Sequence, residues 1–323
     1  MFKKSCRLKN FPISFLAIVL GLAGFTLVLQ KLEELFVIKE PLVSGVLLVF
    51  TLIVFALVLS FYTVKIIFHF KEVKEEYASP IKLNFYPIIA KVFLIVSIIL
   101  FGYGLLSMSK TFLLIGMTLQ FVFTMVIFSI WMHKDKFRID HINPAIFIPI
   151  VGNILIPIAG ISFINSEILW FFFSIGLILW LIFTVIIFYR IIFHEPLPEK
   201  LIPTFFILMA PPAIGFISYI KLTGSLDNFA RILYYFSVFL FLLLVFQFKQ
   251  FIKIKFYLSS WAYTFPLSAF MVATLLMYHL QPQYVFFKYF SILISIILTF
   301  IILYLAGKTV VAIKNKEICV EEK

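Results

Sequence analysis

Charge, cysteine and acidic side chains are all scarce in this sequence of 323 residues. Charged residues make up 13% of the chain and hydrophobic residues 63%, against roughly 25% and 45–50% in soluble domains. So little charge cannot cover a water-facing surface, which excludes a soluble enzyme, a disordered chain and a disulfide-stapled scaffold. The composition therefore indicates an integral membrane protein.

Cysteine contributes only Cys6 and Cys319, at opposite ends of the chain. We expect two inert thiols, no disulfide and no metal site. The histidines lie near the ends of apolar runs without metal-ligand spacing, and we find no nucleophile–base set, phosphate-binding glycine loop or HExxH motif. We therefore predict a protein that is not an enzyme and that uses no cofactor.

Acidic residues are missing from the cores of the apolar runs, and none occurs between Tyr77 and Lys134. Intramembrane acids mark many proton relays and cation pathways. Their absence counts against a proton pump, a sodium-coupled carrier and a cation channel. It is compatible with anions that cross by backbone dipoles and a positive field.

What the chain does contain is ten apolar runs, each long enough to cross a bilayer. We expect transmembrane helices over residues 11–30, 42–69, 85–107, 111–132, 145–164, 168–192, 201–221, 229–248, 257–279 and 285–307. They form a single transmembrane domain over 1–323, with short cytoplasmic tails at 1–10 and 308–323.

Basic residues fall mainly on one side of this arrangement. With ten spans, 20 of the 27 Lys and Arg residues lie on the side of the termini, and Lys91 lies inside the third span. Because Lys and Arg collect in cytoplasmic loops, we predict a multi-pass protein of the cell membrane with both termini in the cytoplasm. The bilayer explains the net charge of +12 without a nucleic-acid partner.

Proline is found in the interiors of the odd-numbered runs and not of the even-numbered ones. The main examples are Pro149, Pro157, Pro211, Pro212 and Pro266. Proline removes a backbone hydrogen bond and kinks a helix, and the freed carbonyl needs protein or a wet cavity beside it. We therefore predict kinked odd helices around a cavity and even helices against lipid; the alternative is that the alternation arises by chance.

Two single residues stand out in the apolar runs. The stem of Lys91 either snorkels to the headgroups or places a charge that attracts anions in a vestibule. Phe265 precedes Pro266 in the run Trp-Ala-Tyr-Thr-Phe-Pro at 261–266. A phenylalanine beside a proline in an inward helix is a candidate for the lumen.

The run at 261–266 resembles the ninth helix of the tellurite-resistance/dicarboxylate transporter family, which joins bacterial TehA and the plant slow-type anion channels. Shorter stretches resemble the family in the same order along the chain. They are Gly21-Leu22-Ala23, Glu76-Tyr77, Asn143-Pro144, Pro149–Asn153 and Ala210-Pro211-Pro212. The resemblance covers about residues 11–307.

This resemblance implies an all-α integral membrane fold of ten transmembrane helices in five helical hairpins. The arrangement would be quasi-fivefold, with the inner odd-numbered helices around a central pore, and the protein would be a homotrimer. In the family a phenylalanine of the ninth helix plugs the pore, and the matching residue is Phe265. We expect Gly21, Gly152 and Asn153 to line the pore, since the glycines leave width and the amide offers donors.

The implied function is an anion channel that passes chloride or nitrate, and we expect opening that does not depend on voltage. One alternative is a carrier or exporter of C4-dicarboxylate, sulfite or tellurite-type oxyanions. Another is a membrane protein without transport, with a solid core. Ala17 and Val19 stand where family first helices often carry Gly and Pro, which predicts a straighter first helix and a bulkier wall.

Overall fold

The computed structural model describes residues 8–38, 41–133 and 138–320, and these ranges hold helices and loops without a strand. Nine helical stretches in them are long and apolar enough to cross a membrane. A further apolar stretch, Pro144–Gly160, is shorter. The chain is therefore a multi-pass helical membrane protein.

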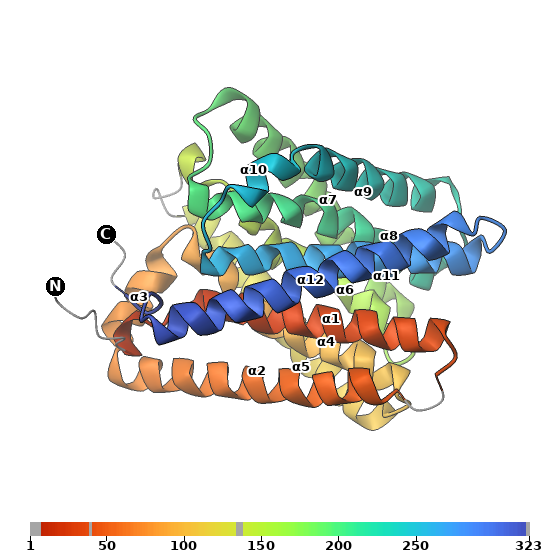
Figure 1. Ribbon diagram of the computed structural model, residues 1–323, viewed down its shortest axis with the longest axis horizontal. Helices are drawn as coiled ribbons and strands as arrows, with labels where there is room; N and C mark the ends of the chain where they lie inside the picture. Colours follow the sequence, from red (N-terminus) through yellow and green to blue (C-terminus); the bar gives the residue numbers. More distant parts are fainter. Residues whose placement is uncertain (1–7, 39–40, 134–137, 321–323) are drawn as a thin grey trace.

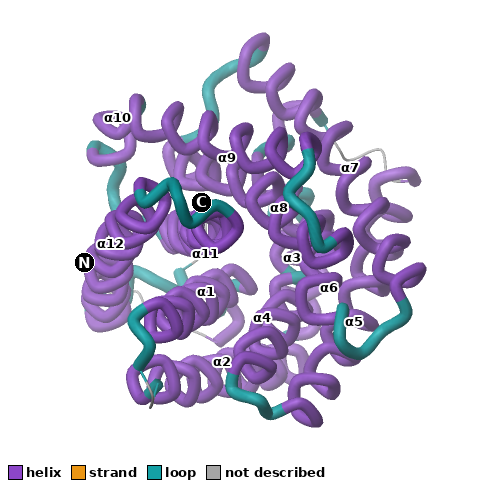
Figure 2. The backbone as a smooth tube through the Cα atoms, turned by 90° about the vertical axis from the view of Figure 1, so that its right-hand side faces the viewer, coloured by secondary structure: helices purple, strands orange, loops and turns teal. Residues whose placement is uncertain are grey.

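Five long helices lie on the outside of the bundle (Figures 1 and 2). They are α2 (Leu42–Phe68), α5 (Leu106–His133), α7 (Ser166–Phe193), α9 (Asn228–Phe246) and α12 (Phe286–Lys314). Between 28% and 39% of the most apolar part of each helix is buried, so most of it points outward. An apolar surface of this extent suits contact with hydrocarbon, where the helix satisfies its own backbone.

Five other helices lie inside and are mostly buried. They are α1 (Leu16–Leu35), α4 (Ile88–Gly102), α6 (Ile148–Gly160), α8 (Ala210–Thr223) and α11 (Thr264–Leu280). Helix α1 contacts α4 and α11, α6 contacts α4 and α8, and α8 contacts α11, so the contacts close a ring (Figure 2). Each inner helix also packs against the outer helix that follows it in the chain.

Every inner helix is preceded by a 3₁₀ segment. These segments are η2 (Ile13–Phe15), η3 (Lys82–Phe85), η5 (Pro144–Phe147), η6 (Glu199–Met209) and η7 (Leu258–Tyr263). They also contact one another in a closed ring, so they share one end of the bundle. The predicted seventh span thus begins as a 3₁₀ segment, and the predicted fifth span ends at Gly160 rather than at 164.

Most of the prolines begin inner helices instead of interrupting them, which corrects the kink interpretation. Pro87 caps α4, Pro149 lies in the first turn of α6, and Pro211 and Pro212 follow the first residue of α8. Proline is favourable there because first-turn amides have no helical acceptor to lose. Pro157 does lie inside α6.

The 3₁₀ ring lies at the end of the bundle where the described chain starts and finishes, called here the termini side; the opposite end is the far side. Lys9 and Ile318, from the two ends of the chain, line one cleft there beside α3 (Phe70–Ala78). Cys319 is buried at this cleft, and Cys6 lies outside the described residues. The remaining short elements are η1 (Leu8–Asn10), η4 (Ile139–His141) and α10 (Phe248–Ile252).

A buried ion pair joins the elements of the termini side. Lys65 of α2 lies 2.7 Å from a carboxylate oxygen of Glu76 in α3, and both side chains are almost fully buried. Glu76 also accepts hydrogen bonds from the Ile13 amide and the Tyr62 hydroxyl, while Lys65 donates to the Phe11 carbonyl. Because each charge has several partners, the network holds the segment that leads into α1 against α2 and α3.

Candidate functional site

The five inner segments present a continuous stripe of residues to a common axis, spaced three and four apart. On α1 the stripe is Ala17, Leu20, Gly24, Leu27 and Lys31, and on α4 it is Ile88, Lys91, Ile95, Ile98 and Gly102. The other three are Ile148, Val151, Leu155 and Ile158; Ile207, Ala210, Ile214 and Ile217; and Ala262, Phe265, Ala269, Val272 and Leu276. This spacing is that of one helix face, so each stripe runs along the axis.

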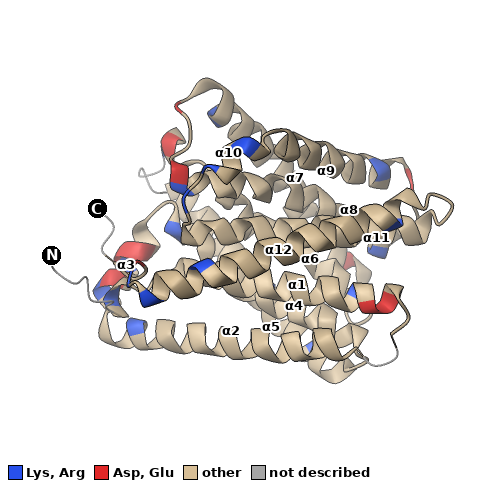
Figure 3. Ribbon diagram, viewed as in Figure 1, with Lys and Arg blue, Asp and Glu red and all other residues tan. Residues whose placement is uncertain are grey.

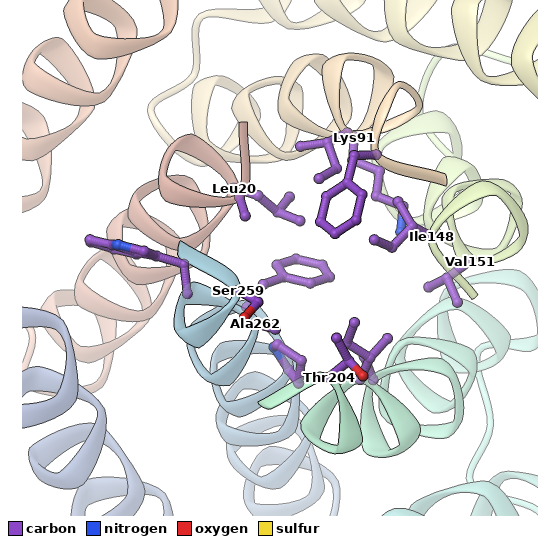
Figure 4. A pocket seen from close by; sticks show the side chains of 15 residues that line it. Leu20, Lys91, Ile148, Val151, Thr204, Ser259 and Ala262 are labelled. Carbon is purple, nitrogen blue, oxygen red and sulfur yellow. The ribbon is translucent and has the colours of Figure 1, made fainter. Parts of the chain in front are cut away.

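At the termini side the stripes enclose a narrow cavity of about 40 Å³. Figure 4 shows labelled side chains from all five inner segments pointing into it, among them Leu20, Val151 and Thr204. Three aromatic residues also line it, namely Phe85, Trp261 and Phe265. The Trp261 indole turns away toward Thr309 of α12, so the phenyl rings of Phe85 and Phe265 explain why so little space is left.

At the far side the same helices enclose a wide cavity of about 660 Å³. Small residues replace the aromatics over much of its wall: Gly24, Gly102, Ala159, Ser162, Ser268 and Ala269. Its charged lining residues are Lys31, Glu34 and Lys221, with His279 nearby. Lys31 and Glu34 form an ion pair at 2.7 Å, so Lys221 adds the unbalanced positive charge of this wall.

Phe265 is the residue that lines both cavities. It is the second residue of α11 and is partly accessible from the lumen. A Cβ atom added at Gly24 would lie 3.2 Å from its ring, so the absence of a side chain at Gly24 leaves room for the ring. The narrow and the wide cavity therefore lie on one axis and meet at this phenyl ring.

Lys91 lines the narrow cavity, and only 3% of it is exposed (Figure 4). This placement does not match a stem that snorkels to the headgroups. Among the described residues its ammonium has no ion pair or hydrogen bond. The other side-chain donors of this cavity are engaged: Thr204 bonds the Leu201 carbonyl, Ser259 that of Lys200, and Trp261 donates to Thr309. Among the described residues that line the narrow cavity, Lys91 is thus the side-chain donor without a hydrogen-bond partner.

The two predicted glycines and the asparagine face neighbouring helices rather than the lumen. A Cβ atom at Gly21 would lie 2.2 Å from the Thr264 hydroxyl oxygen of α11, and one at Gly152 would meet Gln120 of α5. These glycines permit close helix packing. Asn153 donates to Thr124 of α5 at 3.0 Å and to carbonyls of its own helix. Its amide is satisfied within the wall and does not face an anion.

The prolines divide in a similar way. Pro266 lines the narrow cavity beside Phe265. Pro149, Pro157, Pro211 and Pro212 are not part of either lining, although their neighbours Ile148, Ile158 and Ala210 are. The Pro149 carbonyl accepts a hydrogen bond from Gln120, which fixes α6 to α5. These four prolines shape the wall from behind.

Most lumen residues are ordinary aliphatic side chains that the sequence analysis did not single out, such as Leu20, Val151 and Ile214. The sequence feature that could have identified them is their recurrence every three or four residues along the proline-containing runs. Within residues 8–38, 41–133 and 138–320, no three His, Cys, Asp or Glu side chains lie close enough together to hold a metal ion.

Comparison with known proteins finds a matching family and several relatives. Residues 10–310 match the family described as SLAC1, voltage-dependent anion channel. The chain is 31% identical over 311 residues to the S-type anion channel SLAH2 of Arabidopsis thaliana, covering 94% of this chain and 59% of that protein. It is 28% identical over 285 residues to the guard cell S-type anion channel SLAC1 of the same plant, covering 86% and 51%.

A bacterial relative is matched over more of its length. The chain is 26% identical over 276 residues to the tellurite resistance protein TehA homolog of Haemophilus influenzae, covering 84% of this chain and 83% of that protein. The chain thus spans about half the length of the plant relatives and most of the bacterial one. With the family match extending over nearly all of its inner and outer helices, the chain belongs to the SLAC1 family of anion channels.

Proposed function

We propose that this protein is an anion channel that passes small inorganic anions such as chloride and nitrate through the central axis, with Phe265 as the gate. The observation that carries the proposal is the single phenyl ring between two cavities lined by the same five helices. A membrane protein without transport would have no need for a lumen of this size. The family match supports anions as the cargo.

The architecture that we propose has ten transmembrane helices in five hairpins with quasi-fivefold symmetry, all in one domain. The shorter stretch Pro144–Gly160 would be the tenth span. The protein would be a homotrimer in the cell membrane with a pore in each subunit. Both termini would be cytoplasmic, which is supported by the described lysines and arginines that gather at the termini side (Figure 3).

Opening requires the Phe265 ring to leave the axis. The ring is packed between Gly24 on one side and the narrow cavity on the other. A rotation toward the wide cavity, which has room for the ring, would join the two cavities. An anion would then pass between apolar walls. Such walls bind an ion weakly, which favours release over retention.

Selectivity would come from the sign of the lumen charges. Lys91 faces the narrow cavity, and the acid of the wide cavity, Glu34, is already paired with Lys31. A low-dielectric lumen strengthens the field of an unpaired cation, which attracts anions and repels potassium. We also propose voltage-independent opening, because the described spans carry single arginines, Arg190 in α7 and Arg231 in α9, and not an arginine-rich sensor helix.

A second candidate is a carrier or exporter of C4-dicarboxylate, sulfite or tellurite-type oxyanions. It is favoured by the likeness to a protein named for tellurite resistance and by a lumen that Phe265 closes. A carrier would show saturable exchange at rates far below those of a channel.

The test is an anion-substitution series on reconstituted protein. Wild type and Phe265→Ala are recorded in planar bilayers with chloride, nitrate, sulfate and malate, and with potassium or a large organic cation. We expect Phe265→Ala to carry chloride and nitrate currents well above wild type at all voltages. Currents no larger than wild type would refute the gate, and a preference for potassium over chloride would refute the anion pathway. Flux that saturates and needs a counter-anion would support the carrier.

A further inference from the structure

A cavity separate from the lumen opens on the outside of the bundle, between α9, α10 and α12. It has a volume of about 500 Å³, and we call it the outer groove. Most of its lining is apolar, including Leu244, Val245, Phe251, Ile297, Ile301 and Tyr304. Helices α9 and α12 are the outer helices on either side of α11, and Figure 2 shows them spread apart here. The groove therefore faces the space that a bilayer fills.

Positive charge gathers at the termini-side end of this groove. Lys255 lines it, Lys249 and Lys253 are exposed on and just after α10, and Lys308 of α12 lies 5.6 Å from the Tyr304 ring (Figure 3). Glu199 contacts this segment and accepts hydrogen bonds from the Lys255 amide and the Tyr257 hydroxyl. The four lysines outnumber this carboxylate, so the charge at the mouth of the groove is positive on balance.

Short helix α10 has the composition of a segment that lies in the membrane interface. Phe246 and Ile252 are among the most exposed large apolar residues of the protein, and Phe248 between them is half exposed. Exposed apolar rings next to lysines match the boundary between acyl chains and headgroups. This places the lysines at headgroup level and the groove at the level of the acyl chains.

We propose that the outer groove binds one membrane phospholipid with an anionic headgroup, its acyl chain lying along α9 and α12 and its headgroup against Lys249, Lys253 and Lys255. An acyl chain matches the apolar lining, and basic side chains between helices on the cytoplasmic face are suited to acidic headgroups. The groove shares no residue with the lumen lining, so lipid binding can be measured whether or not the protein is a channel.

Three aromatic rings connect the groove to the lumen wall. Phe251 of α10 lies 5.1 Å from Phe206 of η6, and Phe206 lies 4.7 Å from Tyr263 of η7, measured between ring centroids. Phe206 precedes the lumen residue Ile207, and Tyr263 precedes Phe265 by two residues. A bound acyl chain therefore packs behind the segments that hold the gate and stabilises the shut position. This coupling rests on the proposed function.

The test measures binding by native mass spectrometry of the purified full chain. Wild type is titrated with phosphatidylglycerol and phosphatidylcholine of identical acyl chains. The charge variant is Lys249→Gln/Lys253→Gln/Lys255→Gln, and its matched control is Lys71→Gln/Lys74→Gln/Lys314→Gln, which removes the same charge elsewhere on the termini side. Ile301→Trp fills the groove without changing charge. Size-exclusion profiles check that each variant is folded.

We expect wild type and the control to retain one phosphatidylglycerol per chain about tenfold more tightly than phosphatidylcholine. The charge variant should lose that preference, and Ile301→Trp should lose both lipids. Equal lipid preference in the charge variant and its control would overturn the headgroup site. Unchanged retention in Ile301→Trp, or a changed number of chains per particle that points to a second copy on this face, would overturn the acyl-chain site.

The coupling is measured separately, in bilayers with and without phosphatidylglycerol. We expect Ile301→Trp to raise the basal anion current in phosphatidylglycerol about twofold or more, since the lipid no longer supports the shut position. If the lipid-binding results are as expected but the current does not rise, the coupling alone is overturned. If neither wild type nor Phe265→Ala carries an anion current, the result counts against the proposed function instead.

Discussion

The termini side and the far side of the bundle are built from the same five inner segments, yet they differ in backbone, in aromatic content and in free volume. The termini side has the 3₁₀ segments as well as the first turns of the inner helices, with three aromatic residues and Lys91 around about 40 Å³. The far side has α-helical backbone and small residues around about 660 Å³. In the proposed channel, resistance to an ion would therefore be concentrated in the termini-side half of the lumen.

The two halves are also anchored by different means. On the termini side Glu76 pairs with Lys65 in a buried network. On the far side Glu33 is equally buried, but it accepts hydrogen bonds from the Val43 and Ser44 amides at the start of α2. One carboxylate compensates a charge and the other caps a helix.

The largest effect is expected for stability on the termini side. Glu76→Ala leaves Lys65 buried and uncompensated, which costs on the order of 3–5 kcal/mol. The far-side counterpart Glu33→Ala removes a helix cap and should cost about 1–2 kcal/mol. Thermal unfolding in detergent, followed by tryptophan fluorescence, compares the two. A larger loss for Glu33→Ala would reverse the assignment of the stronger anchor.

The next effect is on conduction. Phe265→Ala joins the two cavities, and we expect the chloride flux into liposomes to rise roughly a hundredfold, equivalent to about 2.7 kcal/mol of barrier. Val272→Ala, in the wide cavity on the same helix, should change flux less than twofold. Similar increases in both variants would mean that resistance is spread along the whole path.

Lys91→Met tests the charge of the narrow cavity. In the Phe265→Ala background we expect roughly a tenfold loss of chloride flux, because a buried cation acts on a nearby anion at low dielectric. Lys91→Arg should retain most of the flux. The loss should persist at high salt, since a buried charge is poorly screened. A loss that disappears at high salt would place the charge at the surface instead.

Lys221→Gln gives the smallest effect, because this charge lies in the wide cavity, where an ion can pass farther from it. We expect about a twofold drop in flux at low ionic strength and none near 1 M salt, where the screening length is about 3 Å. Gly307→Ala, on the exposed face of α12 with nothing near the added methyl group, is the neutral control for flux. A salt-independent effect of Lys221→Gln would place a second selectivity element in the wide cavity.

The sequence predicts much of this organisation and little of its orientation. Apolar run length locates the helices, and the prolines separate the buried segments from the exposed ones. The sequence does not show which face of each inner helix lines the lumen, because the lumen face and the packing faces are both apolar. Gly152 and Asn153 therefore looked suitable for the lumen by chemical type, whereas Val151 beside them lines it.

Polar residues mislead for a related reason. In hydrocarbon a side chain such as Asn153 is most stable where a partner satisfies it, and Thr124 and the Pro149 carbonyl do so at the α5–α6 contact. The position of Phe265 in the lumen could be predicted because this residue lies in a stretch that resembles a family motif. Lys91 could be singled out but not oriented, because both snorkelling and inward placement fit its position in the chain.

The long 3₁₀ segment η6 (Glu199–Met209) has a mechanical consequence. A 3₁₀ helix rises about 2.0 Å and turns about 120° per residue, and an α-helix about 1.5 Å and 100°. Each residue of η6 that changed to α-helix would shorten the segment by about 0.5 Å and unwind it by about 20°. Thr204 and Ile207 would then move along the helix axis and rotate about it at the same time. A change of this kind in η6 would therefore shift and rotate part of the wall that Phe265 also lines.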